Sequence, residues 1–116
     1  MPQRKQYKIF LTKTAGQMLE EKMRYIAEQL FEPAVAQNWL LRLLEFLELK
    51  LTTFPKKFPQ YRESKYRIVV YRNDVIIYEV DEGNATVYID LACTKGRNID
   101  HLLKLHFDVD DSFEYE

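Results

Sequence analysis

Apolar and polar residues alternate at the start of the chain and then change to a helical spacing. Residues 7–12 (YKIFLT) place an apolar side chain at every second position, which predicts a strand with one apolar face. From residue 14 onward the apolar side chains recur three and four apart, which predicts an amphipathic helix with one buried stripe. The stripe contains Ala15, Leu19, Met23, Ile26 and Leu30. We expect Thr14 to begin and cap this helix, with Gln17 completing a capping box.

A second helical stripe follows Pro33. Proline suits the first position of a helix because its missing N–H would be unpaired there. The apolar residues of this stripe are Ala36, Leu40, Leu43, Leu47, Leu51 and Phe54. Pro55 and Pro59 are expected to end the helix. The pattern therefore predicts a tight helical hairpin from about residue 14 to residue 54.

The second half of the chain has the pattern of three short strands, at residues 66–71, 75–81 and 85–91. Their connections, residues 72–74 (RND) and 82–84 (EGN), are short and turn-forming, so neighbouring strands should pair as an antiparallel meander. Residues 99–107 are expected to form a short amphipathic helix. The predicted fold class is α+β: an N-terminal strand, a helical hairpin and then an antiparallel meander, with the helices on one face of the sheet.

Length and composition fit one folded domain. The chain has 116 residues, of which 47% are hydrophobic, and only three glycines. We assign residues 1–107 to this domain and residues 108–116 to an acidic tail. No apolar run approaches the roughly 20 residues that a membrane helix needs, and no signal peptide is evident. Cys93 is the only cysteine, so a cytoplasmic protein without an internal disulfide is expected, with Cys93 packed in an apolar strand.

The net charge of −1 divides unevenly along the chain. The tail contains five acids and no basic residue, which leaves 17 basic against 13 acidic residues in positions 1–107. Residues 56–72 hold six of these basic residues with four aromatic residues between them, a mixture typical of single-stranded RNA binding. The basic residues are Lys56, Lys57, Arg62, Lys65, Arg67 and Arg72, and the aromatic ones are Phe58, Tyr61, Tyr66 and Tyr71. The alternative is a solvated loop leading into a strand with half-buried tyrosines.

A second basic group follows the last predicted strand and comprises Lys95, Arg97, His101 and Lys104. We hypothesise that the two basic groups converge on one concave surface. Arg67 and Arg97 could then stabilise the phosphate during metal-free RNA cleavage. Several residues could move protons, and the spacing does not choose among Lys56, Lys65, His101 and Tyr71. No metal or cofactor motif is expected, because the two histidines are five residues apart and no glycine-rich nucleotide loop is present.

The succession of motifs resembles the RelE/ParE toxin superfamily over residues 7–100. The resemblance rests on the opening strand, the first helix with Tyr25-Ile26-Ala27, and Pro33 and Ala36 at the second helix. It continues through Phe54-Pro55, Tyr66-Arg67-Ile68-Val69-Val70, Ile77-Tyr78-Glu79-Val80-Asp81 and Arg97-Asn98.

This resemblance implies a growth-arresting toxin that a cognate antitoxin covers and silences. The implied target is either messenger RNA in the ribosome, which RelE-like members cut, or DNA gyrase, which ParE-like members inhibit. By position, Arg67 and Arg97 match recurrent arginines of the superfamily, and Lys56, Lys57 and Lys65 lie where its nucleases carry basic residues. The catalytic candidates are Arg67, Arg97 and Lys65, and the target-binding candidates are Lys56, Lys57, Arg62, Tyr66, Tyr71, Arg72 and Lys95.

The closing segment GRNID lacks the His-Tyr pair or the lone catalytic tyrosine that many nuclease members have near this end, which weakens the RNA-cleaving interpretation. Pro33, Ala36 and Phe54-Pro55 lean slightly toward the ParE-like side. A non-toxic interaction module is the remaining alternative. Both a homodimer and a toxin–antitoxin hetero-oligomer are compatible with the sequence.

Overall fold

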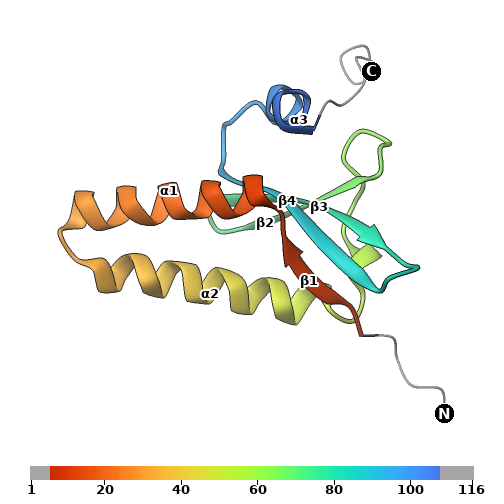
Figure 1. The fold of residues 1–116 in the computed structure, drawn as a ribbon, viewed down its shortest axis with the longest axis horizontal. Helices are drawn as coiled ribbons and strands as arrows, with labels where there is room; N and C mark the ends of the chain where they lie inside the picture. Colours follow the sequence, from red (N-terminus) through yellow and green to blue (C-terminus); the bar gives the residue numbers. More distant parts are fainter. Residues whose placement is uncertain (1–5, 108–116) are drawn as a thin grey trace.

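The computed structural model describes residues 6–107 of the chain, so the acidic tail lies outside the described residues. A four-stranded sheet and two long antiparallel helices form the body, and a third helix lies on the sheet (Figure 1). The elements in chain order are β1 (Lys8–Leu11), α1 (Lys13–Leu30), α2 (Pro33–Leu51), the short 3-10 helix η1 (Pro55–Lys57), β2 (Tyr66–Tyr71), β3 (Asp74–Asp81), β4 (Thr86–Thr94) and α3 (Ile99–Phe107). The predicted α+β class and the order of the elements are confirmed.

The first helix begins earlier than its sequence pattern suggests. Thr12, and not Thr14, is the N-cap, and its Oγ1 accepts a hydrogen bond of 3.2 Å from the Ala15 N–H. Thr12 is held in place because its own N–H donates to the carbonyl of Ile89, at 3.0 Å. The alternating pattern of the strand extends over Thr12 and hides this signal, which explains the misplaced cap.

The helical hairpin projects well beyond the sheet (Figure 1). Near the sheet Ala15, Leu19, Leu43 and Leu47 are buried. Leu40 is only partly buried, and Leu30 at the end of α1 is 54% exposed. The whole stripe predicted on α1 is apolar, but only its first half packs against the sheet. The second half packs mainly against α2.

The sheet has the strand order β1-β4-β3-β2. Strands β2, β3 and β4 form the predicted antiparallel meander, whereas β1 pairs in parallel with β4 from Lys8↔Thr86 to Leu11↔Ile89. The connection from β1 to β4 contains the hairpin and strands β2 and β3, so it is long enough to allow parallel pairing. The sheet is thus mixed, with β1 as the parallel edge strand.

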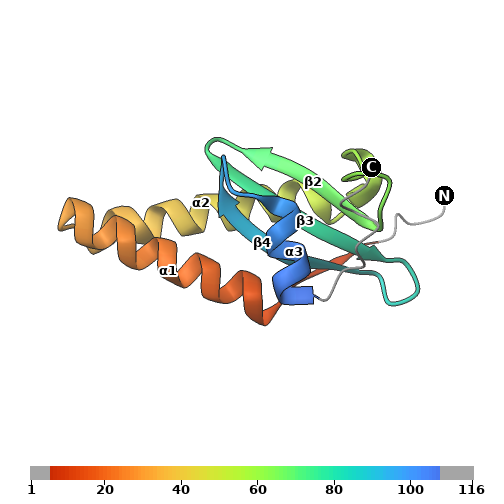
Figure 2. The same ribbon diagram turned by 90° about the horizontal axis from the view of Figure 1, so that it is seen from above.

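The two faces of the sheet pack against different helices. Ile76, Tyr78, Val87 and Ile89 pack in one core with the hairpin. Residues of the opposite alternation, including Ile77 and Leu91, pack with Leu102 and Leu103 of α3. The hairpin therefore lies on one face, as expected, while α3 covers part of the other face (Figure 2). None of the helices within residues 6–107 combines the length and the apolar character needed to span a membrane.

Strand β4 contains one residue more than its neighbour β3 can pair with. Tyr78 pairs with Ile89 and Ile77 pairs with Leu91, so Asp90 forms a β-bulge. The bulge reverses the alternation of β4, because Ile89 faces the hairpin and Leu91 faces α3.

Candidate functional site

The basic residues lie at two opposite ends of the sheet. Strands β2 and β4 both run antiparallel to β3, so their last residues meet at one end, where the N–H of Lys95 donates to the carbonyl of Asn73 at 3.0 Å. Arg72 and Arg97 belong to this end. Lys56, which pairs with Glu82, and Lys65, which pairs with Glu79, belong to the other end. The two groups do not form the single concave surface that we hypothesised.

Arg67 makes structural hydrogen bonds to the main chain in this structure. It lies on the hairpin face of β2, opposite Tyr78, and its Nη1 donates to the carbonyls of Phe58 at 2.7 Å and Lys56 at 3.3 Å. The Tyr78 hydroxyl donates to the carbonyl of Pro55 at 2.6 Å. These bonds attach the loop after α2 to the sheet, and they direct the Arg67 guanidinium toward main-chain oxygens.

The tyrosines of β2 are packing residues. Tyr66 is 2% exposed, and burial raises its pKa to about 12, with further contributions from the charges of Glu79 and Asp90. Tyr71 packs on Phe46, with 4.5 Å between the ring centroids. Neither ring is presented for stacking on a base. This agrees with the alternative interpretation of a loop leading into a strand whose tyrosines are buried.

Arg62 belongs to a polar cluster with Asp100, whereas Lys57 is exposed. Arg62 forms an ion pair of 3.0 Å with Asp100, to which the Tyr61 hydroxyl also donates at 2.5 Å. This cluster connects the loop before β2 to the first turn of α3. Lys57 is exposed beside the ring of Phe58.

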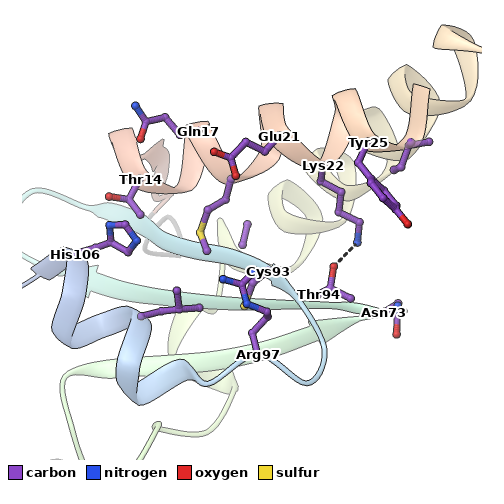
Figure 3. A pocket seen from close by; sticks show the side chains of 14 residues that line it. Thr14, Gln17, Glu21, Lys22, Tyr25, Asn73, Cys93, Thr94, Arg97 and His106 are labelled. Carbon is purple, nitrogen blue, oxygen red and sulfur yellow. Dashed lines mark hydrogen bonds between the residues drawn. The ribbon is translucent and has the colours of Figure 1, made fainter. Parts of the chain in front are cut away.

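Arg97 lies at a groove of about 590 Å³ between α1, the end of β4 and α3 (Figure 3). The floor is apolar and contains Met18 and the buried thiol of Cys93, whose pKa is raised mainly by burial. Lys22 crosses the groove, donates to Thr94 Oγ1 at 3.2 Å and pairs with the buried Asp74. Lys22 thereby attaches α1 to the sheet, and Arg97 remains an exposed cation at the rim of this groove.

The opposite end of the sheet carries a group of aromatic and charged side chains on the α3 side. Within residues 6–107, α3 leaves this end of the face open, beyond the part that it covers in Figure 2. Phe10 is 55% exposed and makes an edge-on contact with Tyr88, with 5.5 Å between the centroids. Tyr88, Glu79, Lys65 and Lys56 line a neighbouring groove of about 470 Å³. We call this region the open sheet end.

Glu79 is the central acid of the open sheet end. Its Oε1 is 3.2 Å from Nζ of Lys65, and its side chain is partly exposed. Behind it lies Asp90, which is 1% exposed and whose Oδ2 has no hydrogen-bond partner among the described residues. Burial, followed by the adjacent Glu79 carboxylate, raises the pKa of Asp90 to about 8. Its buried position therefore favours the protonated, uncharged form of Asp90.

Sequence reasoning missed Phe10, Glu79, Tyr88 and Asp90. The signal that could have found Asp90 is a lone acid within the apolar run of residues 87–93 (VYIDLAC), where an unpaired charge is costly. The placement of Phe10 beside Tyr88 depends on the parallel pairing of β1 with β4, which short-range patterns do not predict.

No protein-family model matches this sequence, and no curated protein matches it significantly. Among solved structures, it is similar to a chain of the toxin–antitoxin complex RelBE2 from Mycobacterium tuberculosis, with a TM-score of 0.57. The likeness covers 79% of this chain and 94% of that chain at 19% sequence identity. The two chains therefore share a fold. The fold that the sequence resemblance implies is thus confirmed.

Proposed function

We propose that this protein is the toxin of a bacterial toxin–antitoxin pair and that a cognate antitoxin neutralises it. The observation that carries the proposal is the likeness to a chain of the RelBE2 complex over nearly the whole length of that chain. The order of sequence motifs from Tyr7 to Asn98 supports the same assignment independently. Growth arrest is the expected consequence of expressing the protein alone.

RNA cleavage is the mode of action that the surface favours. The open sheet end presents the rings of Phe10 and Tyr88 together with Lys56 and Lys65. Aromatic rings stack on unpaired bases and lysines neutralise phosphates, so this combination fits single-stranded RNA. Inhibition of DNA gyrase by binding is the alternative mode of action for a protein with these sequence motifs.

Induced expression in bacteria tests the proposal. The expected result is growth arrest that co-expression of the adjacent gene relieves. Mapping of messenger RNA ends and a supercoiling assay with purified gyrase then separate the two modes of action. A folded protein that is harmless at high expression would contradict the toxin assignment and leave an interaction module in its place.

A further inference from the structure

We infer that Glu79 is the general base of RNA cleavage at the open sheet end, that Lys65 is the general acid, and that Asp90 positions Glu79. This inference rests on the RNA-cleaving form of the proposed function. On this inference, the groove of about 470 Å³ binds a ribose-phosphate segment of single-stranded RNA as its substrate.

The base and the acid form an ion pair beside one groove, where a bound phosphodiester can come between them. Glu79 Oε1 and Lys65 Nζ are 3.2 Å apart, and the Lys65 side chain is 67% exposed, so both groups reach the groove. Lys56 lies in the same groove, where it pairs with Glu82 and adds a second cation for the phosphate. A base, an acid and an additional cation thus surround one space of a size that suits a small ligand or a nucleotide.

The reaction balances with these groups alone. The Glu79 carboxylate takes the proton of a ribose 2′-hydroxyl, and the 2′-oxygen forms a bond to the adjacent phosphorus. The bond between phosphorus and the 5′-oxygen breaks, and that oxygen takes a proton from the Lys65 ammonium. The products are a 2′,3′-cyclic phosphate and a 5′-hydroxyl. Protonated Glu79 then returns its proton to the Lys65 amine, which restores the site.

Asp90 positions the Glu79 carboxylate. Two adjacent carboxyl groups share one proton more readily than they carry two charges, and the buried member retains the proton. Protonated Asp90 can donate to Glu79 from the side of the sheet, while Lys65 pairs with Glu79 from the open side. Among the described residues, three charged or titratable groups act on Asp90 or respond to it: Glu79 on β3, Lys65 in the loop before β2, and Tyr66 at the first position of β2.

The bulge gives Asp90 its place. Bulges occur next to active sites, where they redirect a side chain, and this one inserts a carboxyl group beside Glu79 in the apolar run of residues 87–93. A buried carboxyl with an unpaired oxygen destabilises the fold, so packing alone does not account for its presence.

The test compares purified full-length variants in cleavage of messenger RNA on translating ribosomes and of a free RNA oligonucleotide. We expect Glu79→Gln to lower the rate at least 100-fold without lowering the melting temperature. Glu63→Gln, which removes an exposed acid of the same loop as Lys65, should stay within threefold of the wild type. A Glu79→Gln protein that cleaves RNA within threefold of the wild type overturns the inference.

The role of Asp90 has its own readout in the pH profile. Asp90→Ala should slow cleavage about tenfold at pH 7, and Asp90→Asn, whose amide can still donate to Glu79, should restore it. The loss of activity expected near pH 8 in the wild type should be absent from Asp90→Asn. An Asp90→Asn profile identical to that of the wild type overturns the positioning role.

Growth arrest separates this inference from the proposed function. A wild-type protein that arrests growth without cutting RNA overturns the inference and leaves the toxin assignment standing. Absence of both effects overturns both.

Discussion

At the scale of single residues, the buried Asp90 sets an unusual pH dependence of stability. Its pKa is raised to about 8 in the folded protein, while an unfolded aspartate titrates near pH 4. Between these values the folded chain binds a proton that the unfolded chain lacks. The contribution of Asp90 to the free energy of unfolding therefore falls as pH rises from about 4 to about 8, and it is constant above that range.

Replacing Asp90 with Asn should remove this dependence. The free energy of unfolding of Asp90→Asn minus that of the wild type should grow with pH across this window, by at most about 1.4 kcal/mol per pH unit. Urea denaturation of both proteins at pH 5, 6, 7 and 8 measures the difference. A difference that is constant with pH would mean that Asp90 titrates normally.

At the scale of elements, the beginning of α1 shows how far local patterns determine structure. Helix and strand positions follow from periodicity, and α3 begins and ends where the pattern places it, at Ile99 and Phe107. The cap is misplaced because the main-chain bond that holds Thr12 comes from Ile89, 77 positions away in the chain. The three additional residues of β4 also escape the pattern, since the bulge at Asp90 breaks its alternation.

Thr12→Ala should therefore destabilise the protein by about 1 kcal/mol, because the Ala15 N–H loses its acceptor. Thr14→Ala should have a much smaller effect, since Thr14 lies within the first turn of the helix. Thermal or urea unfolding of the two variants gives the comparison. A larger loss for Thr14→Ala than for Thr12→Ala would return the cap to position 14.

At the scale of the whole molecule, the candidate site could be predicted only in part. Lys56 and Lys65 lie at the open sheet end. Their exposure could be predicted, because short-range charge patterns identify exposed cations well. Arg67 and Tyr66 share the same stretch of sequence, but strand alternation and the loop after α2 turn them inward. The carboxylate of the site, Glu79, belongs to a sequence pattern that predicts only a strand. The residues around Glu79 come from β1, β4 and the loop before β2.

The bulge has a consequence for insertions and deletions. Most single-residue deletions inside a central strand exchange its two faces and unfold the protein. Deletion of Asp90 should instead produce a regular strand, because Ile89 and Leu91 already pair with the consecutive residues Tyr78 and Ile77. We expect the shortened chain to fold with an unchanged or higher melting temperature, whereas deletion of Tyr88 should abolish folding. The fold tolerates the loss of this one position in β4, and a deletion variant would retain the shape of the protein without its buried acid.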